Sequence, residues 1–176
     1  MIEKDKMEQI EKQVSGLLKE YGYTPQAGAS VDIVKFVQSL GFVVGNAKLP
    51  QNEDGFLAIN PRDADMSKVI GVNTDRSPDW KRFIVAHEFA HSLLHYNVGS
   101  VYLHRENKKG KDEQENEADY FAAALLMPRD SFKLSCRNLS AHGLTENALY
   151  MQLASIYKVP LESAARRVKE VTNITV

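Results

Sequence analysis

The chain has almost no cysteine and no long apolar run. Cys136 is the single cysteine among 176 residues, which excludes an intramolecular disulfide framework and is typical of a reducing compartment. We expect this thiol to be a buried small hydrophobe. The charged N-terminal residues 1–6 are followed by no apolar stretch, unlike those of a signal peptide, and no segment approaches the ~18 apolar residues that a bilayer-spanning helix needs. These absences predict a cytoplasmic protein.

The chain also lacks a strong net charge. Its formal charge of −1 produces no global field that would attract nucleic acid or a membrane surface. The apolar and charged fractions of 43% and 26% are those of an ordinary globular protein, and the length suits one domain with a real core. We therefore expect residues 1–176 to form a single domain, with its core at about 30–128 and a helical C-terminal segment at about 130–171.

Helical patterns occupy both ends of the chain, and β-prone runs lie between them. Gly, Asn, Asp and Pro clusters separate these runs, as in a small antiparallel sheet. Ser77 before Pro78 predicts the start of a core helix, and Pro128 predicts the end of another. The expected fold class is α+β, with helices around a small antiparallel sheet. The expected helices are 3–21, 30–40 (capped by Ser30), 77–96, 112–127 and two or three within 130–171; the expected strands are 42–44, 55–59 and 68–72, and 97–112 is an expected loop.

The predicted 77–96 helix contains the sequence His87-Glu88-Phe89-Ala90-His91. Histidines four residues apart leave one face of a helix one turn apart, so two ring nitrogens can reach one metal ion at ~2.0–2.1 Å. Glu88 lies beside the first ligand and can act on a water that the metal activates. Two imidazoles and a carboxylate favour Zn²⁺, although Mn²⁺ or Co²⁺ could also bind. The alternative is two surface histidines on a charged helix, but the apolar residues around them indicate a buried helix.

A catalytic zinc site needs a third protein ligand and an open position. Glu115 and Asp119 share one face of the predicted 112–127 helix, and small alanines on this helix permit close packing against the histidine helix. Glu115 can serve as the carboxylate ligand, while Asp119 can accept a hydrogen bond from a ligand histidine and fix its tautomer. Glu113 and Glu117 are rivals that point to other faces. All three glutamates could instead form a solvated acidic first turn.

The pairing of residues 87–91 with the segment from Glu115 to Pro128 resembles the ImmA/IrrE family of bacterial and phage metallopeptidases. The paired helices are also similar to the zincin-like active-site helices of the gluzincins. The resemblance extends from about Ser30 to Met127 and implies one zinc ion held by His87, His91 and Glu115, with Glu88 as catalytic base. Family members often carry Asn where Asp119 stands. By resemblance, the substrate would be a helix-turn-helix transcriptional repressor, cleaved during stress or mobile-element induction.

Other residues have weaker claims to a role. Tyr102 and His104, in the predicted 97–112 loop, could donate hydrogen bonds to the developing oxyanion, although an ordinary exposed loop is the alternative. His95 continues the histidine series, but its position favours a helix-end residue over a ligand. Residues 145–168 resemble a helix-turn-helix, and Arg166, Arg167 and Lys169 could meet phosphate. Glutamates dilute this charge, so direct DNA binding is not favoured.

Three functions therefore compete. The first is a zinc endopeptidase that acts on a protein substrate. The second is a binding module that retains the fold and the zinc but antagonises a repressor without cleaving it; the intact Glu88 argues for the enzyme instead. The third is a DNA-binding regulator that uses the C-terminal helices, which the near-neutral charge disfavours.

Overall fold

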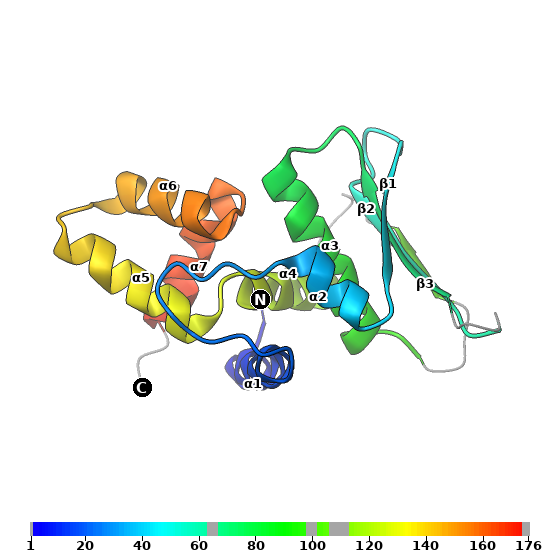
Figure 1. The fold of residues 1–176 in the computed structure, drawn as a ribbon, viewed down its shortest axis with the longest axis horizontal. Coiled ribbons are helices and arrows are strands. Elements are labelled where there is room, and N and C mark those ends of the chain that lie inside the picture. The colour runs from blue at the N-terminus through cyan, green and yellow to red at the C-terminus, as the bar shows by residue number, and fades with distance from the viewer. Residues whose placement is uncertain (1, 63–66, 98–101, 106–112, 174–176) are drawn as a thin grey trace.

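The computed structural model describes residues 2–62, 67–97, 102–105 and 113–173. It is elongated, with a sheet at one end, helices α5 to α7 at the other, and α1, α3 and α4 between them (Figure 1). This arrangement confirms the predicted α+β class. The helices are α1 (Lys4–Glu20), α2 (Ile33–Ser39), α3 (Pro78–Leu94), α4 (Glu113–Leu126), α5 (Arg129–Ala141), α6 (Glu146–Tyr157) and α7 (Leu161–Asn173), and the strands are β1 (Val43–Ala47), β2 (Gly55–Asn60), β3 (Ser67–Asn73) and β4 (Tyr102–Arg105).

The sheet has four strands in the order β1-β3-β2-β4. Strand β2 pairs antiparallel with both β3 and β4, but β1 pairs parallel with β3, so the sheet is mixed rather than wholly antiparallel. Strand β2 alternates buried and half-buried residues, with Leu57 and Ile59 on the core side. A strand with one packed face needs this period of two. The sheet therefore covers α3 with one face.

Local sequence explains where the helices begin. Ser77 caps α3 by accepting a hydrogen bond from the Trp80 amide, and Pro78 occupies the first turn, where a missing amide hydrogen costs nothing. Asp32, and not the predicted Ser30, caps α2 by accepting from the Lys35 amide. Both residue types cap well, so sequence alone could not choose between two candidates only two positions apart.

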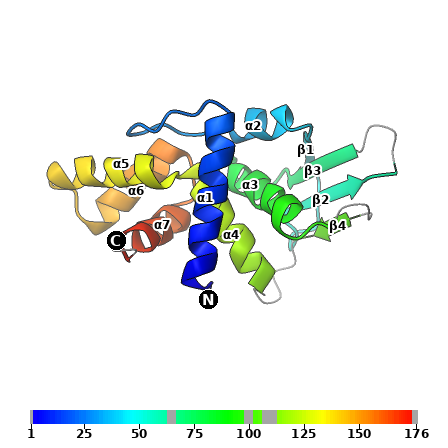
Figure 2. The ribbon, with the colours of Figure 1, turned by 90° about the horizontal axis from the view of Figure 1, so that it is seen from below.

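Helices α3 and α4 form the centre of the molecule, and α1 crosses α4 on the outside (Figure 2). Small residues allow the close approach of α3 and α4, since Ala118 and Ala122 of α4 are completely buried. Phe89 of α3 makes edge contacts with Phe36, Phe42 and Phe121, a geometry that aromatic rings prefer. The metal-site helix is thus held by aromatic contacts on the side away from its histidines.

The C-terminal helices are attached to this centre at several points. Arg82 of α3 donates hydrogen bonds to the carbonyls of Lys158 and Val31, joining α3 to the turn between α6 and α7.

Cys136 of α5 is only half-buried at the edge of the core, where burial raises its pKa to about 11. No helix in the described part of the chain has the length and apolar character that spanning a bilayer requires.

Candidate metal centre

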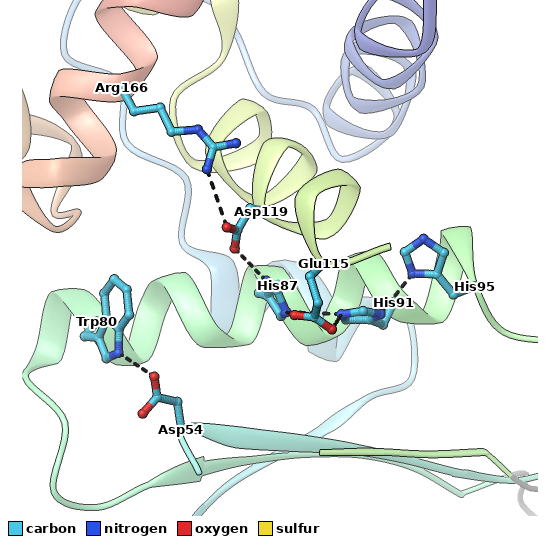
Figure 3. Close-up of polar contacts among 8 residues, drawn as sticks. All are labelled: Asp54, Trp80, His87, His91, His95, Glu115, Asp119 and Arg166. Atoms are coloured by element: carbon cyan, nitrogen blue, oxygen red, sulfur yellow. Dashed lines mark hydrogen bonds and ion pairs between the residues drawn. The ribbon is translucent and has the colours of Figure 1, made fainter. Parts of the chain in front are cut away.

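His87 and His91 lie one turn apart on α3 and are almost completely buried. Their Nε2 atoms approach each other to 3.1 Å. Both rings therefore point to one place between α3 and α4, as Figure 3 shows. The alternative of two surface histidines is wrong and the expected buried helix is confirmed, since His87 and His91 are only 3% and 1% exposed.

Glu115 of α4 completes the group from the opposite side. Its carboxylate oxygens lie 3.2 Å from His87 Nε2 and 3.3 Å from His91 Nε2. Among the described residues, His87, His91 and Glu115 form the group that could hold a metal ion, with all ligand atoms within 4.8 Å of one another. The rival glutamates lie elsewhere: Glu113 is exposed, and Glu117 forms an ion pair with Lys6.

The spacing of these three side chains suits zinc. Atoms bound at ~2.0–2.1 Å in a tetrahedral arrangement lie ~3.3–3.4 Å apart. The two Nε2 atoms lie 3.1 Å apart, and each lies 3.2 or 3.3 Å from its nearer oxygen of Glu115, which is Oε2 for His87 and Oε1 for His91. Two imidazole nitrogens and one carboxylate oxygen also form a donor set that catalytic zinc sites use. The residues present therefore fit a divalent metal of this kind, with one coordination position left for a reactant.

Asp119 lies one turn beyond Glu115 and accepts a hydrogen bond from His87 Nδ1 at 3.0 Å. This bond leaves Nε2 of His87 directed at Glu115 and fixes the tautomer that binds a metal. Burial opposes a charged His87, but the hydrogen bonds to Asp119 and Glu115 outweigh it and raise the pKa of His87 to about 10. A metal at this site must displace that proton, so binding is coupled to proton release.

His95 supports the second histidine, a role that the sequence analysis missed. Its Nδ1 lies 2.9 Å from His91 Nδ1, and its Nε2 lies 3.4 Å from a Glu117 oxygen. Burial lowers the pKa of His95 and outweighs the opposing effect of Glu117, so a neutral ring can accept from His91 and donate to Glu117. The spacing of four residues from His91 was the available signal, but it indicated shared direction without showing which nitrogen would be engaged.

Glu88 is completely buried and lies on the side of α3 that faces the start of β2. A side chain added at Gly55 would place its Cβ 3.6 Å from Glu88 Oε1, 2.4 Å from Ile84 Cγ2 and only 2.9 Å from the backbone oxygen of Gly71. Gly55 is therefore needed for the close approach of β2 to α3. The strand backbone and the helix together confine the carboxylate of Glu88.

The start of β2 is fixed by a second polar group. Asp54 is 1% exposed, forms an ion pair with Arg76 and accepts a hydrogen bond from the Trp80 indole at 3.2 Å. Trp80 in turn stacks on Phe83. The Trp80–Asp54 hydrogen bond joins the first turn of α3 to the start of β2 (Figure 3), so the strand end that confines Glu88 has a defined position.

Tyr102 and His104 belong to strand β4 and not to a loop. They stand in register with Ile59 and Leu57 of β2, which places them on the edge strand of the sheet. Their side chains lie outside the described part of the structure, so their role as oxyanion donors stays a prediction. The prediction of one continuous loop over 97–112 is wrong for residues 102–105, because pairing with β2 overrides the polar local sequence.

The two arginines of α7 do not form a phosphate-binding pair. Arg167 is completely buried and pairs with Glu11 at 2.7 Å, while its Nε donates to the carbonyl of Met127. Arg166 reaches Asp119 at 3.4 Å and Glu170 at 2.7 Å. The interpretation of Arg167 as a possible phosphate contact is therefore wrong, because its guanidinium is bonded to Glu11 and to the Met127 carbonyl inside the protein.

Two comparisons with known proteins found matches for this chain. The family model of a peptidase group described as "IrrE N-terminal-like domain" matches residues 37–169, which extends the resemblance past Met127 into the C-terminal helices. A solved structure named "Mycobacterium tuberculosis transcriptional regulator" has a similar fold, with a TM-score of 0.57 and 16% identity over 92% of this chain. The match spans only 46% of that longer structure. The search of curated proteins gave no match.

Proposed function

The chain belongs to the peptidase family of IrrE N-terminal-like domains, and from this premise we propose that it is a zinc-dependent endopeptidase. The observation that carries the proposal is the convergence of His87, His91 and Glu115 on one point at the spacing of tetrahedral zinc ligands. A buried cluster of this composition is costly unless a cation neutralises it. Zinc binding and peptide hydrolysis at one site account for both its geometry and its charge.

In the proposed mechanism each residue has a separate task. His87, His91 and Glu115 hold the ion, and Asp119 orients His87 through Nδ1. The bound zinc supplies a Lewis acid that acidifies water and polarises the scissile carbonyl. Glu88 accepts a proton from the attacking water at its carboxylate, and the water oxygen forms the new bond to the carbonyl carbon. Glu88 then returns the proton to the leaving nitrogen as the C–N bond breaks.

The surroundings of Glu88 suit a proton carrier. Its carboxylate is removed from bulk solvent and held between α3 and the backbone at Gly55. A fixed position within reach of the reacting water matters more for a general base than its intrinsic strength. Tyr102 and His104 stand on the neighbouring edge strand, and we keep them as candidates for stabilising the oxyanion.

For the substrate we propose a helix-turn-helix transcriptional repressor. Support comes from the resemblance to ImmA/IrrE peptidases and from a regulator's name on a structure with this fold. Direct DNA binding by this chain has less support, because Arg167 is committed to Glu11. A role without cleavage remains the second outcome of the experiment below.

The test incubates the zinc-loaded protein with the repressor encoded by the neighbouring gene and follows fragments by mass spectrometry. The wild type should cleave it, and Glu88→Gln should retain one zinc per chain while losing about 10²–10⁴-fold in rate, as removal of a general base does. Glu113→Gln, an exposed glutamate on α4, is the matched control and should cleave normally. Cleavage by Glu88→Gln at the wild-type rate would refute the mechanism, and repressor binding without any fragments would favour the non-cleaving module.

A further inference from the structure

We propose that Arg166 is a positioning residue for the metal site, through which helix α7 sets the zinc affinity. The proposal rests on the metal site described above and goes beyond it, because Arg166 touches neither a metal ligand nor the base in the contacts described. It acts through Asp119. The C-terminal helical segment then becomes part of the metal centre, although it contributes no ligand.

The contacts form one continuous series from α7 to the ligand. Arg166 Nη1 lies 3.4 Å from Asp119 Oδ2, and the other oxygen of the same carboxylate, Oδ1, lies 3.0 Å from His87 Nδ1. Figure 3 shows the guanidinium of Arg166 extending from α7 toward Asp119 on the side away from the histidine. The carboxylate thus has one oxygen for the ligand and one for the cation, which restricts rotation about its terminal bond.

Arg166 is itself held in this position. Its Nε donates to Glu170 Oε1 at 2.7 Å, one turn along α7. A guanidinium that is tethered at one end and planar loses less entropy when it forms a further hydrogen bond. Arg166 therefore reaches Asp119 from a defined direction, as a positioning group must.

Charge gives a second reason for an arginine at this place. Glu88, Glu115 and Asp119 bring three carboxylates to one buried region around two histidines. A divalent ion balances two of these charges, and Arg166 can balance the third. Buried carboxylates that repel one another are costly unless paired, so removing the arginine should loosen Asp119 and, with it, the orientation of His87.

The neighbouring Arg167 shows that this placement is specific to one side of α7. Arg167 points toward Glu11 and Tyr120, while Arg166 points to Asp119, and Glu170 lies within reach of both arginines. Consecutive residues on a helix diverge by about 100°, so α7 makes both sets of contacts at once. A shift of α7 that moved Arg166 would be transmitted to the ligand histidine.

The experiment measures zinc affinity of the full chain by competition with a chromophoric chelator. Arg166→Gln should weaken binding by about tenfold, the lower end of the 10–100-fold loss seen when groups behind a ligand are removed. Arg137→Gln is the matched control, since Arg137 is exposed on α5 and the described contacts include no ion pair for it; it should leave the affinity unchanged. The visible spectrum of bound Co²⁺ should shift in Arg166→Gln and not in the control.

A double-mutant cycle separates positioning from a general loosening of the fold. Asp119→Asn should weaken zinc binding more than Arg166→Gln does, and adding Arg166→Gln to it should cost less than a further twofold, because both changes break one series of contacts. The inference is overturned if Arg166→Gln matches the control, or if it weakens binding equally with and without Asp119. If instead the wild type binds no zinc, the proposed function fails as well, so the two failures are distinguishable.

Discussion

Helix α4 borders two buried clusters of charged residues that differ in their charge balance. On the side toward α3 lies the metal cluster: His87, Glu88, His91, Glu115 and Asp119. On the side toward α1 and α7 lies the ion-pair cluster: Glu11, Tyr120, Arg129, Arg167 and Glu170. Both clusters are largely buried in the same fold. Comparing them therefore shows how the balance of charge, and not burial, distinguishes the two.

The ion-pair cluster neutralises itself. Arg167 and Arg129 face Glu11, Glu170 lies beside Arg167, and Tyr120 donates a hydrogen bond to Glu11. Two arginines balance two glutamates without any added ion, and Glu170 also pairs with Arg166 at 2.7 Å. The metal cluster has three carboxylates around two histidines, with Arg166 at its border. The difference is that permanently charged arginines balance the ion-pair cluster, whereas the metal cluster is balanced by a proton on His87, whose pKa is raised to about 10, and a metal ion can replace that proton.

The largest effect should come from breaking the balanced cluster. Arg167→Met leaves Glu11 buried without its main cation, and loss of one partner of a buried pair costs about 3–5 kcal/mol. Urea unfolding of the metal-free protein measures this change in the free energy of unfolding. Zinc affinity of the folded variant should fall less than in Arg166→Gln, because Arg166 and not Arg167 contacts Asp119. A loss below about 1 kcal/mol would show that the two clusters are not distinguished in this way.

The metal cluster should instead gain stability from an added ion. Free zinc at about 100 times its Kd should raise the free energy of unfolding by about 2.7 kcal/mol, because only the folded state offers the assembled site. Glu115→Ala should abolish the increment, while Glu113→Ala, on the exposed side of the same turn, should retain it. Thermal unfolding with zinc and with a chelator measures both. An equal zinc increment in the two variants would contradict the assignment of Glu115.

A smaller difference in the free energy of unfolding, between wild type and Glu11→Gln, should depend on pH in the acid range. Burial raises the pKa of Glu11, but Arg167 and Arg129 outweigh this and hold the pKa below its ordinary value of 4.5. The stabilisation from ionised Glu11 is therefore complete above pH 4.5 and disappears as the pH falls through the lower folded-state pKa. Wild type and Glu11→Gln, compared by urea unfolding in a chelator, should converge in stability over that acid range. A constant difference there would show that Glu11 does not titrate as the contacts imply.

The smallest change in stability should come from a substitution at Lys158, which lies outside both clusters. Lys158 ends α6 in the left-handed region with φ +54°, a conformation that costs a residue with a side chain roughly 1–2 kcal/mol. Lys158→Gly should stabilise the protein by up to about 1 kcal/mol, and its carbonyl can still accept from Arg82. Thermal unfolding should show the same zinc increment as in the wild type. A changed increment would mean that stability at the α6–α7 turn and metal binding are coupled.

Sequence alone predicted those parts of the site that depend on spacing within one helix. His87 and His91 share a face because they are four residues apart, and Glu115 and Asp119 share one for the same reason. That the two faces meet depends on the alanines of α4, which the sequence displays. The three-ligand group was therefore predictable, although its function as a catalytic centre stays a proposal.

Contacts between distant segments could not be predicted in this way. The parallel pairing of β1 with β3 requires a crossover that no local pattern specifies, and β4 acquires strand structure through β2. Arg166 and Arg167 look equivalent in sequence, yet one supports Asp119 and the other is buried against Glu11. The rotation of α7 decides between them, and that rotation is a property of the packed core.

X-ray absorption at the zinc edge, on protein loaded with one equivalent of zinc, tests the central claim most directly. We expect one ion per chain, with two imidazole nitrogens and carboxylate oxygen at ~2.0–2.1 Å. Absence of bound zinc, or a spectrum without imidazole ligands, would contradict a metal centre formed by His87, His91 and Glu115.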